Sequence, residues 1–148
     1  MKFSKKSRYG IRALIDLSVY SANEHIVLGS IAERNGISPQ YLEQIFASLR
    51  RAGIVKGIKG SQGGYKLNRE PKEIMVSEII EALEGSYKIE PEDAADDAHA
   101  RSISESIQEL VIDKVNEGVG SLLQNITLED LREKYFDKKD SGQDMYYI

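Results

Sequence analysis

The positions of apolar residues predict that the first part of the chain is helical. Between Ser7 and Ala22 they form two stripes at helical spacing, which is typical of a helix buried on two sides. A short helix is expected over residues 28–35, and a second helix over residues 39–52 follows almost at once, with Ser38 as its N-cap. The buried stripe of this second helix consists of Leu42, Ile45, Phe46 and Leu49.

After the second helix the pattern changes to two short strands, expected at residues 54–58 and 64–67. Four glycines, at positions 57, 60, 63 and 64, lie in and between these strands. Two helices joined by a tight turn and followed by a β-hairpin describe a winged helix-turn-helix. The glycines allow the hairpin backbone to approach a nucleic-acid groove closely; the alternative is that they only supply positive φ angles.

The second half of the chain is again helical. A short helix is expected over residues 76–84, and a longer helix begins at Ala98 and continues toward Gln124. Thr127 and the three residues after it resemble a capping box that opens a last helix to about Tyr135. The expected parts are a winged helix-turn-helix DNA-binding domain (1–85), an acidic linker (86–97), dimerisation helices (98–136) and a flexible C-terminal tail (137–148).

The long helix carries an apolar stripe that resembles the seam between partner helices. A dimer interface is therefore expected on this helix, and the apolar sides of the first helix are candidates to join it. A stripe buried within its own chain is the alternative. The members of the stripe are Ile103, Ile107, Leu110 and Val111.

Composition restricts the classes of function. The 148 residues suit one compact domain, or a small domain with a helical arm, and no apolar run is long enough to span a membrane. The start of the chain lacks a signal-peptide core, so a soluble cytoplasmic protein with no membrane partner is expected. There is no cysteine, which excludes disulfides, thiolate metal sites and iron-sulfur clusters. With two distant histidines, we expect no metal site and no cofactor.

The charge is unevenly distributed. Residues 1–70 hold 12 Lys and Arg against 5 Asp and Glu, and residues 71–148 hold 8 against 19. A basic half beside an acidic half suggests a module that binds a polyanion, joined to a part with another task. The alternative is two solvated surfaces that differ by chance.

Side chains on the open face of the second helix suit recognition of double-stranded DNA. Gln40 and Gln44 can read adenine in a major groove, and Glu43 can accept from the amine of cytosine. Other candidates on this helix are contacts to phosphate or base from Ser38 and Tyr41, and contacts to the DNA backbone from Arg50 and Arg51. A merely solvated helix face is the competing interpretation.

The hairpin tip and the chain start add further candidates. Lys59 supplies charge toward phosphates, as do Lys56 and Lys66, while Gly60 lets the tip come close. Ser61 and Gln62 offer hydrogen bonds. A third contact, or only a solubilising end, is expected from Lys5, Lys6 and Arg8.

Three stretches carry a family resemblance: "RYGIRALIDLSVYS", "SIAERNGISPQYLEQIFASLRRAGIVKGIKGSQGGYKL" and "VSEIIEALEG". They resemble the IscR, NsrR and CymR group of bacterial winged-helix regulators, the Rrf-two family. The resemblance implies a homodimer on a palindromic operator, with a helix in the major groove and the wing tip in the minor groove. By position it assigns base contacts to Ser38, Gln40, Tyr41 and Glu43, and wing contacts to Lys59, Gly60 and Ser61.

The cysteine-free CymR-type branch is the part of this family that the chain most resembles. That resemblance implies a repressor of sulfur and cysteine metabolism that acts with cysteine synthase, the O-acetylserine thiol-lyase. The synthase accepts an isoleucine-ended tail, so we expect Tyr146, Tyr147 and Ile148 to bind it. A frayed end with incidental tyrosines is the alternative.

Two other functions compete with a DNA-binding repressor. One is a winged-helix module that binds acidic proteins, and the other is a repressor that senses a small metabolite directly. An enzyme is not expected, because the sequence has no nucleophile-histidine pair, metal constellation or nucleotide-binding loop.

Overall fold

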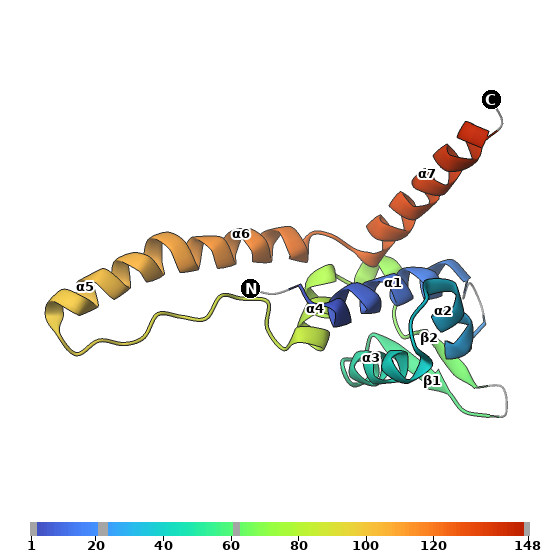
Figure 1. The fold of residues 1–148 in the computed structure, drawn as a ribbon, viewed down its shortest axis with the longest axis horizontal. Helices are drawn as coiled ribbons and strands as arrows, with labels where there is room; N and C mark the ends of the chain where they lie inside the picture. The colour runs from blue at the N-terminus through green and yellow to red at the C-terminus, as the bar shows by residue number, and fades with distance from the viewer. Residues whose placement is uncertain (1–2, 21–23, 61–62, 147–148) are drawn as a thin grey trace.

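The computed structural model describes residues 3–20, 24–60 and 63–146. In this part the chain forms a helical domain with a small hairpin, a long helical arm on one side and a last helix that projects on the other (Figure 1). The elements are α1 (Lys5–Tyr20), α2 (Leu28–Asn35), α3 (Pro39–Arg51), β1 (Val55–Ile58), β2 (Gly64–Leu67), a 3₁₀ turn η1 (Pro71–Glu73), α4 (Val76–Glu84), α5 (Ala98–Ile107), a π-helical turn η2 (Gln108–Ile112), α6 (Asp113–Gln124) and α7 (Leu128–Tyr146).

The turn between α2 and α3 follows the predicted capping chemistry. Gly36 ends α2 in the left-handed region at φ 63°, and its N–H donates to the carbonyl of Ala32. Ser38 Oγ accepts from the backbone N–H of Tyr41 at 3.1 Å, and Pro39 occupies the first helical position. These local bonds set where α3 begins.

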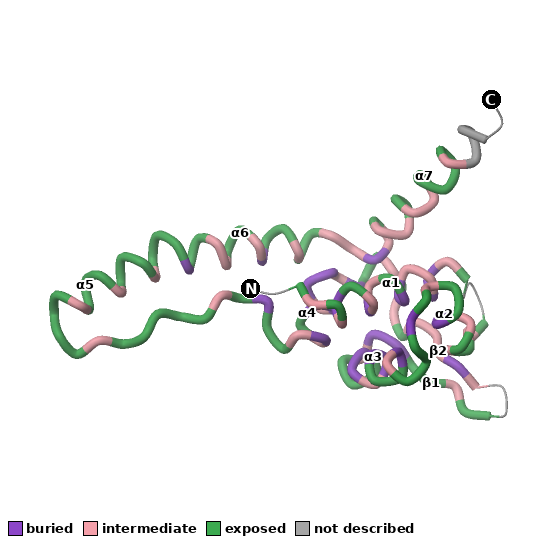
Figure 2. Tube along the Cα trace, in the orientation of Figure 1, coloured by how far each residue is buried: buried purple, intermediate pink, exposed green. Residues whose placement is uncertain are grey.

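The hydrophobic core lies between α1, α2, α3, α4 and the hairpin (Figure 2). The predicted stripe of α3 is fully buried, and the ring of Phe46 packs 4.9 Å from the ring of Tyr65. The prediction that α1 is buried on both sides is only partly right. Leu14 and Leu17 are fully buried, whereas Tyr20 is 48% exposed although the Arg34 guanidinium lies 4.3 Å from its ring centroid.

The hairpin is antiparallel and pairs Val55 with Leu67. β1 begins one residue later than predicted. Ile26 and Tyr65 exchange two backbone hydrogen bonds of 2.9 Å, which attaches the segment before α2 to the edge of β2. The wing is therefore held against the helix-turn-helix by backbone bonds as well as by its side chains.

The arm is one nearly continuous helix made of α5, η2 and α6, and it reaches Gln124 as predicted (Figure 1). The segment of residues 86–97 runs back beside it. Tyr87 is buried, and the N–H of Ile89 donates to Asn116 Oδ1 at 2.8 Å. The expectation of a wholly exposed linker is therefore wrong at its start, because one aromatic ring and one amide fix it to the arm.

The capping box before α7 is confirmed. The N–H of Thr127 donates to Asp130 Oδ2 at 2.9 Å, and the N–H of Asp130 donates to Thr127 Oγ1 at 3.0 Å. The prediction that this helix ends near Tyr135 and is followed by an irregular tail is wrong, since α7 continues to Tyr146. This stretch contains no proline, and its alternating charges suit a solvated helix.

Candidate nucleic-acid interface

The open face of α3 is lined with polar side chains. The apolar stripe of α3 and Ser48 are buried in the core, and most of the remaining positions face solvent. Amide and carboxylate groups on such a face can pair with base edges in a major groove. The exposed residues at this face and at its N-cap are Ser38, Gln40, Glu43, Gln44 and Arg51.

Tyr41 differs from these residues because it is half-buried. Its ring meets the ring of Tyr9 edge to face, with 5.8 Å between the ring centroids. Tyr41 therefore connects the start of α3 to α1, in addition to any contact with nucleic acid.

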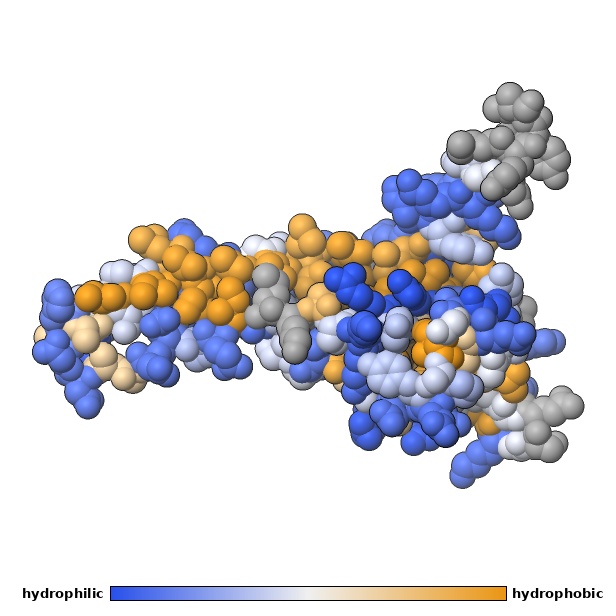
Figure 3. All heavy atoms as spheres, viewed as in Figure 1, coloured by the Kyte–Doolittle hydropathy of each residue, from blue (hydrophilic) through white to orange (hydrophobic). Residues whose placement is uncertain are grey.

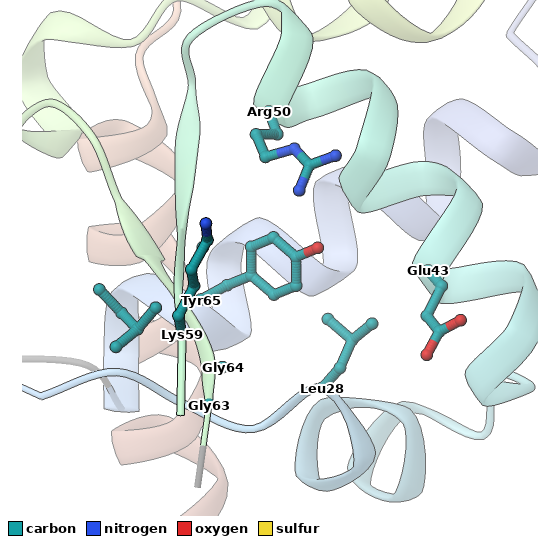
Figure 4. A pocket seen from close by; sticks show the side chains of 9 residues that line it. Leu28, Glu43, Arg50, Lys59, Gly63, Gly64 and Tyr65 are labelled. Carbon is teal, nitrogen blue, oxygen red and sulfur yellow. The ribbon is translucent and has the colours of Figure 1, made fainter. Parts of the chain in front are cut away.

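A groove of about 590 Å³ separates α3 from the hairpin (Figure 4). Glu43 and Arg50 line this groove from α3, and Lys59 and Tyr65 line it from the hairpin side. Sequence reasoning placed Arg50 beside Arg51 as a backbone contact, and it overlooked Tyr65. The structure places Arg50 in the groove.

Glycines are needed in the hairpin for internal reasons. A Cβ on Gly64 would collide with the carbonyl oxygen of Ile26, and one on Gly63 would lie 2.5 Å from the carbonyl oxygen of Ile58. Gly60 has a φ of 134°, which side chains rarely adopt. The alternative that the glycines only supply positive φ angles therefore fits Gly60, whereas Gly63 and Gly64 are required by the close approach of neighbouring backbone.

The hairpin lysines lie on two sides. Lys59 lines the groove beside α3, whereas Lys56 and Lys66 pair across the strands and line a second groove of about 800 Å³. Ser61 and Gln62, the expected hydrogen-bonding residues of the tip, lie outside the described residues.

One basic residue at the start of α1, Lys6, contacts α3. Lys6 Nζ and Arg51 Nη2 both donate to Ser48 Oγ, at 3.5 Å and 3.2 Å. Lys5 and Arg8 are exposed, and the Arg8 guanidinium stacks 4.6 Å from the centroid of Phe3. The structure thus brings Lys6 and Arg51 together and leaves the other two cations at the surface.

An ion pair that sequence reasoning missed holds α2 on α1. Arg34 donates through two nitrogens to Asp16, with Nε 2.9 Å from Oδ2, and Asn35 Nδ2 donates to the same oxygen at 3.1 Å. The hydrogen bond to Asp16 raises the pKa of the Arg34 guanidinium above its ordinary value. The partners are 18 residues apart in the chain, so no local pattern indicates them.

The stripe on the arm is exposed, which makes the alternative of a core stripe within the same chain wrong. Ile103, Ile107, Leu110 and Val111 are 52, 38, 67 and 52% exposed. An apolar band follows the arm in Figure 3. Leu122 of α6, 62% exposed, extends the same kind of surface.

No helix in the described part of the chain is long and apolar enough to cross a membrane. Within the same residues, no three His, Cys, Asp or Glu side chains gather as metal ligands would.

A sequence profile of the Rrf2 family, described as "Iron-dependent Transcriptional regulator", matches residues 3–134. The residues of this chain do not fit a thiolate-bound iron centre, because the sequence contains no cysteine.

Known relatives agree with the profile. The HTH-type transcriptional regulator CymR of Bacillus subtilis (strain 168) is 38% identical over 148 residues, all of both chains. Two solved structures are similar. IscR of T. potens has 41% identity and a TM-score of 0.67 over 91% of this chain and 88% of that one. CymR of B. subtilis, "the Global Cysteine Regulator", has 36% identity and a TM-score of 0.65 over 90% and 98%. These relatives are transcriptional regulators and not enzymes, and the chain belongs to the Rrf2 family of winged-helix, DNA-binding transcriptional regulators.

Proposed function

We propose that this protein is a cytoplasmic, homodimeric repressor of sulfur and cysteine metabolism genes that works without an iron-sulfur cluster. The observation that carries the proposal is the exposed polar face of α3, which lies beside a wing that carries the positively charged Lys59. The metabolic role is supported by the full-length similarity to CymR, whose B. subtilis member is called a global cysteine regulator.

In the proposed complex α3 enters the major groove of a palindromic operator. Gln40 and Gln44 read adenine, and Glu43 accepts from a cytosine amine. The wing enters the adjacent minor groove, where Lys59 and Gly60 approach the backbone. Further contacts to phosphate or base come from Ser38, Tyr41, Arg51, Lys5, Lys6 and Arg8, with Ser61 and Gln62 at the wing tip.

The second copy binds through the arm. The apolar stripe of α5 and η2 is exposed in a single chain, and covering it removes apolar surface from water. A two-fold pair places two α3 helices on half-sites about 34 Å, or a multiple of that, apart.

The regulatory partner in this proposal is cysteine synthase, which binds residues 145–148. Support comes from the similarity to CymR and from α7, which projects from the domain and brings Met145 and Tyr146 to its far end. Tyr147 and Ile148 lie outside the described residues, and Tyr146 is described only as part of the helix.

The test is operator binding by the purified full chain across a series of salt concentrations. About six phosphates neutralised by a dimer give a log-log slope near −5. We expect Gln40→Ala and Gln44→Ala to change sequence preference by about 1–3 kcal/mol per base pair read. Lys59→Ala, as the matched phosphate contact, should weaken all sequences alike.

The proposal would be contradicted if operator affinity did not change with salt concentration, or if palindromic and scrambled duplexes bound with equal affinity. Either result would favour a module that binds acidic proteins instead.

A further inference from the structure

Glu84, the last residue of α4, is bonded to the first turn of α1, far from it in sequence. Its Oε1 accepts from the Ser4 N–H at 3.0 Å and from Ser7 Oγ at 2.6 Å, and the Ser4 hydroxyl is a third donor to the same oxygen. Ser7 is fully buried. Hydrogen bonds to a carboxylate are stronger than neutral ones, and a negative charge at a helix N-terminus is favourable. Glu84 therefore fixes the position of this turn.

The same turn carries Lys6 onto α3. Lys6 and Arg51 meet at Ser48, which is 7% exposed and whose hydroxyl is also placed 3.4 Å from the Gln44 carbonyl. The ion pairs found among the described residues include neither cation. Like charges held side by side repel each other, so an anion such as a DNA phosphate stabilises this arrangement.

The other side of α4 is attached to the arm. Val76 and Ile80 pack with Val119 and Leu123 of α6, and the Val76 N–H donates to the Ile126 carbonyl at 2.8 Å. α4 therefore touches the arm on one side and α1 on the other.

Between α4 and α1 the contact is close. Gly10 faces Leu83 with no room for a Cβ, so the two helices cannot shift independently without losing this packing.

We infer that Glu84 is a positioning residue for DNA binding. It links the arm to the first turn of α1, and through that turn it places Lys6 beside Arg51, where the two cations share the Ser48 hydroxyl and can bind one phosphate. The inference rests on the proposed function and adds a route by which the arm influences operator affinity. Without the Glu84 carboxylate, the first turn of α1 is no longer held by these hydrogen bonds, and Lys6 no longer lies where it can bind a DNA phosphate.

The test uses Glu84→Ala in the full chain, because it removes all three acceptor contacts and because charge and position predict opposite results. Removing a negative charge should strengthen binding to a polyanion if Glu84 acts only through its charge. A positioning role predicts about tenfold weaker operator binding and a salt slope shallower by about 2 for a dimer that loses one phosphate contact per chain. Glu81→Ala is the matched control, since Glu81 is exposed on the same helix and the charge change is identical.

A double-mutant cycle with Lys6→Ala makes the test specific. We expect Glu84→Ala to have little effect once Lys6 is removed, because both changes remove the same phosphate contact. If Glu84→Ala proves too unstable to study, Ser7→Ala removes one of the bonds without changing charge and should weaken binding in the same direction.

The inference is overturned if Glu84→Ala binds the operator as tightly as the wild type or tighter, or if its effect adds fully to that of Lys6→Ala. Failure of the proposed function has a different signature, since then the wild-type chain itself shows no operator preference.

Discussion

At the residue scale, Gly64 shows how backbone contact selects a single amino acid. The segment before α2 bonds to β2 through Ile26 and Tyr65, and this brings the Ile26 carbonyl against the Gly64 Cα. Any side chain at this position would push the wing away from the helix-turn-helix.

Replacing Gly64 with alanine should lower the free energy of unfolding by about 2–4 kcal/mol, because backbone cannot move aside as a flexible side chain can. Gly57→Ala in the paired strand is the matched control. There a Cβ would lie 3.7 Å from Tyr65 Cε1, an ordinary contact, so a change within about 1 kcal/mol is expected. Urea unfolding followed by circular dichroism measures both, and equal losses would refute the explanation.

At the scale of elements, α7 divides into a docked half and a projecting half. Arg132 Nε donates to the Ser18 carbonyl at 3.1 Å, and Tyr135 is half-buried near the end of α1. Burial raises the pKa of the Tyr135 hydroxyl. Beyond this point the residues from Asp137 to Ser141 are exposed, which leaves this stretch of α7 accessible to a partner.

Deleting residues 145–148 should abolish the complex with cysteine synthase while operator affinity of the chain alone stays unchanged. Of the deleted residues, Met145 and Tyr146 are the last of α7 and lie at its projecting end, away from α3 (Figure 1). Calorimetric titration of the synthase and a parallel gel shift measure the two properties. A truncated chain that still binds the synthase would remove these residues from the interface.

At the scale of the whole molecule, the proposed function assigns dimer assembly to the arm and DNA recognition to α3 and the wing. The arm exposes a continuous stripe of large apolar side chains, which a helix that faces only water does not usually carry. This stripe lies apart from α3 and the wing (Figures 1 and 3). In the proposed dimer each winged module contacts few base pairs, so we expect operator affinity to depend on pairing of the arms.

Leu110→Asp should convert the dimer to monomer and weaken operator binding at least tenfold, since a carboxylate in an apolar seam is costly to bury. Ser102→Asp adds the same charge on α5, outside the stripe, and should leave assembly unchanged. Light scattering after gel filtration reports the mass. A Leu110→Asp protein that remains dimeric would place the interface elsewhere.

Local rules were enough to predict much of this fold. The ends of α2 and α3, the hairpin and the capping box before α7 follow from side chains within a few residues of the bonds that they make. The polar face of α3 follows in the same way, because helical periodicity separates core positions from solvent positions. The true end of α7 escaped this reasoning, since a charged stretch that contains Gly142 but no proline is compatible with either a helix or a tail.

Tertiary structure decided which of the candidate side chains meet. The pairing of Arg34 with Asp16, the contact of Glu84 with Ser7 and the burial of Tyr87 each join segments that are separate in the chain. No periodicity encodes such contacts, because they depend on how finished helices pack. The same packing places Arg50 in the groove between α3 and the hairpin and Arg51 beside Lys6. The sequence alone does not show that these two adjacent arginines have different surroundings.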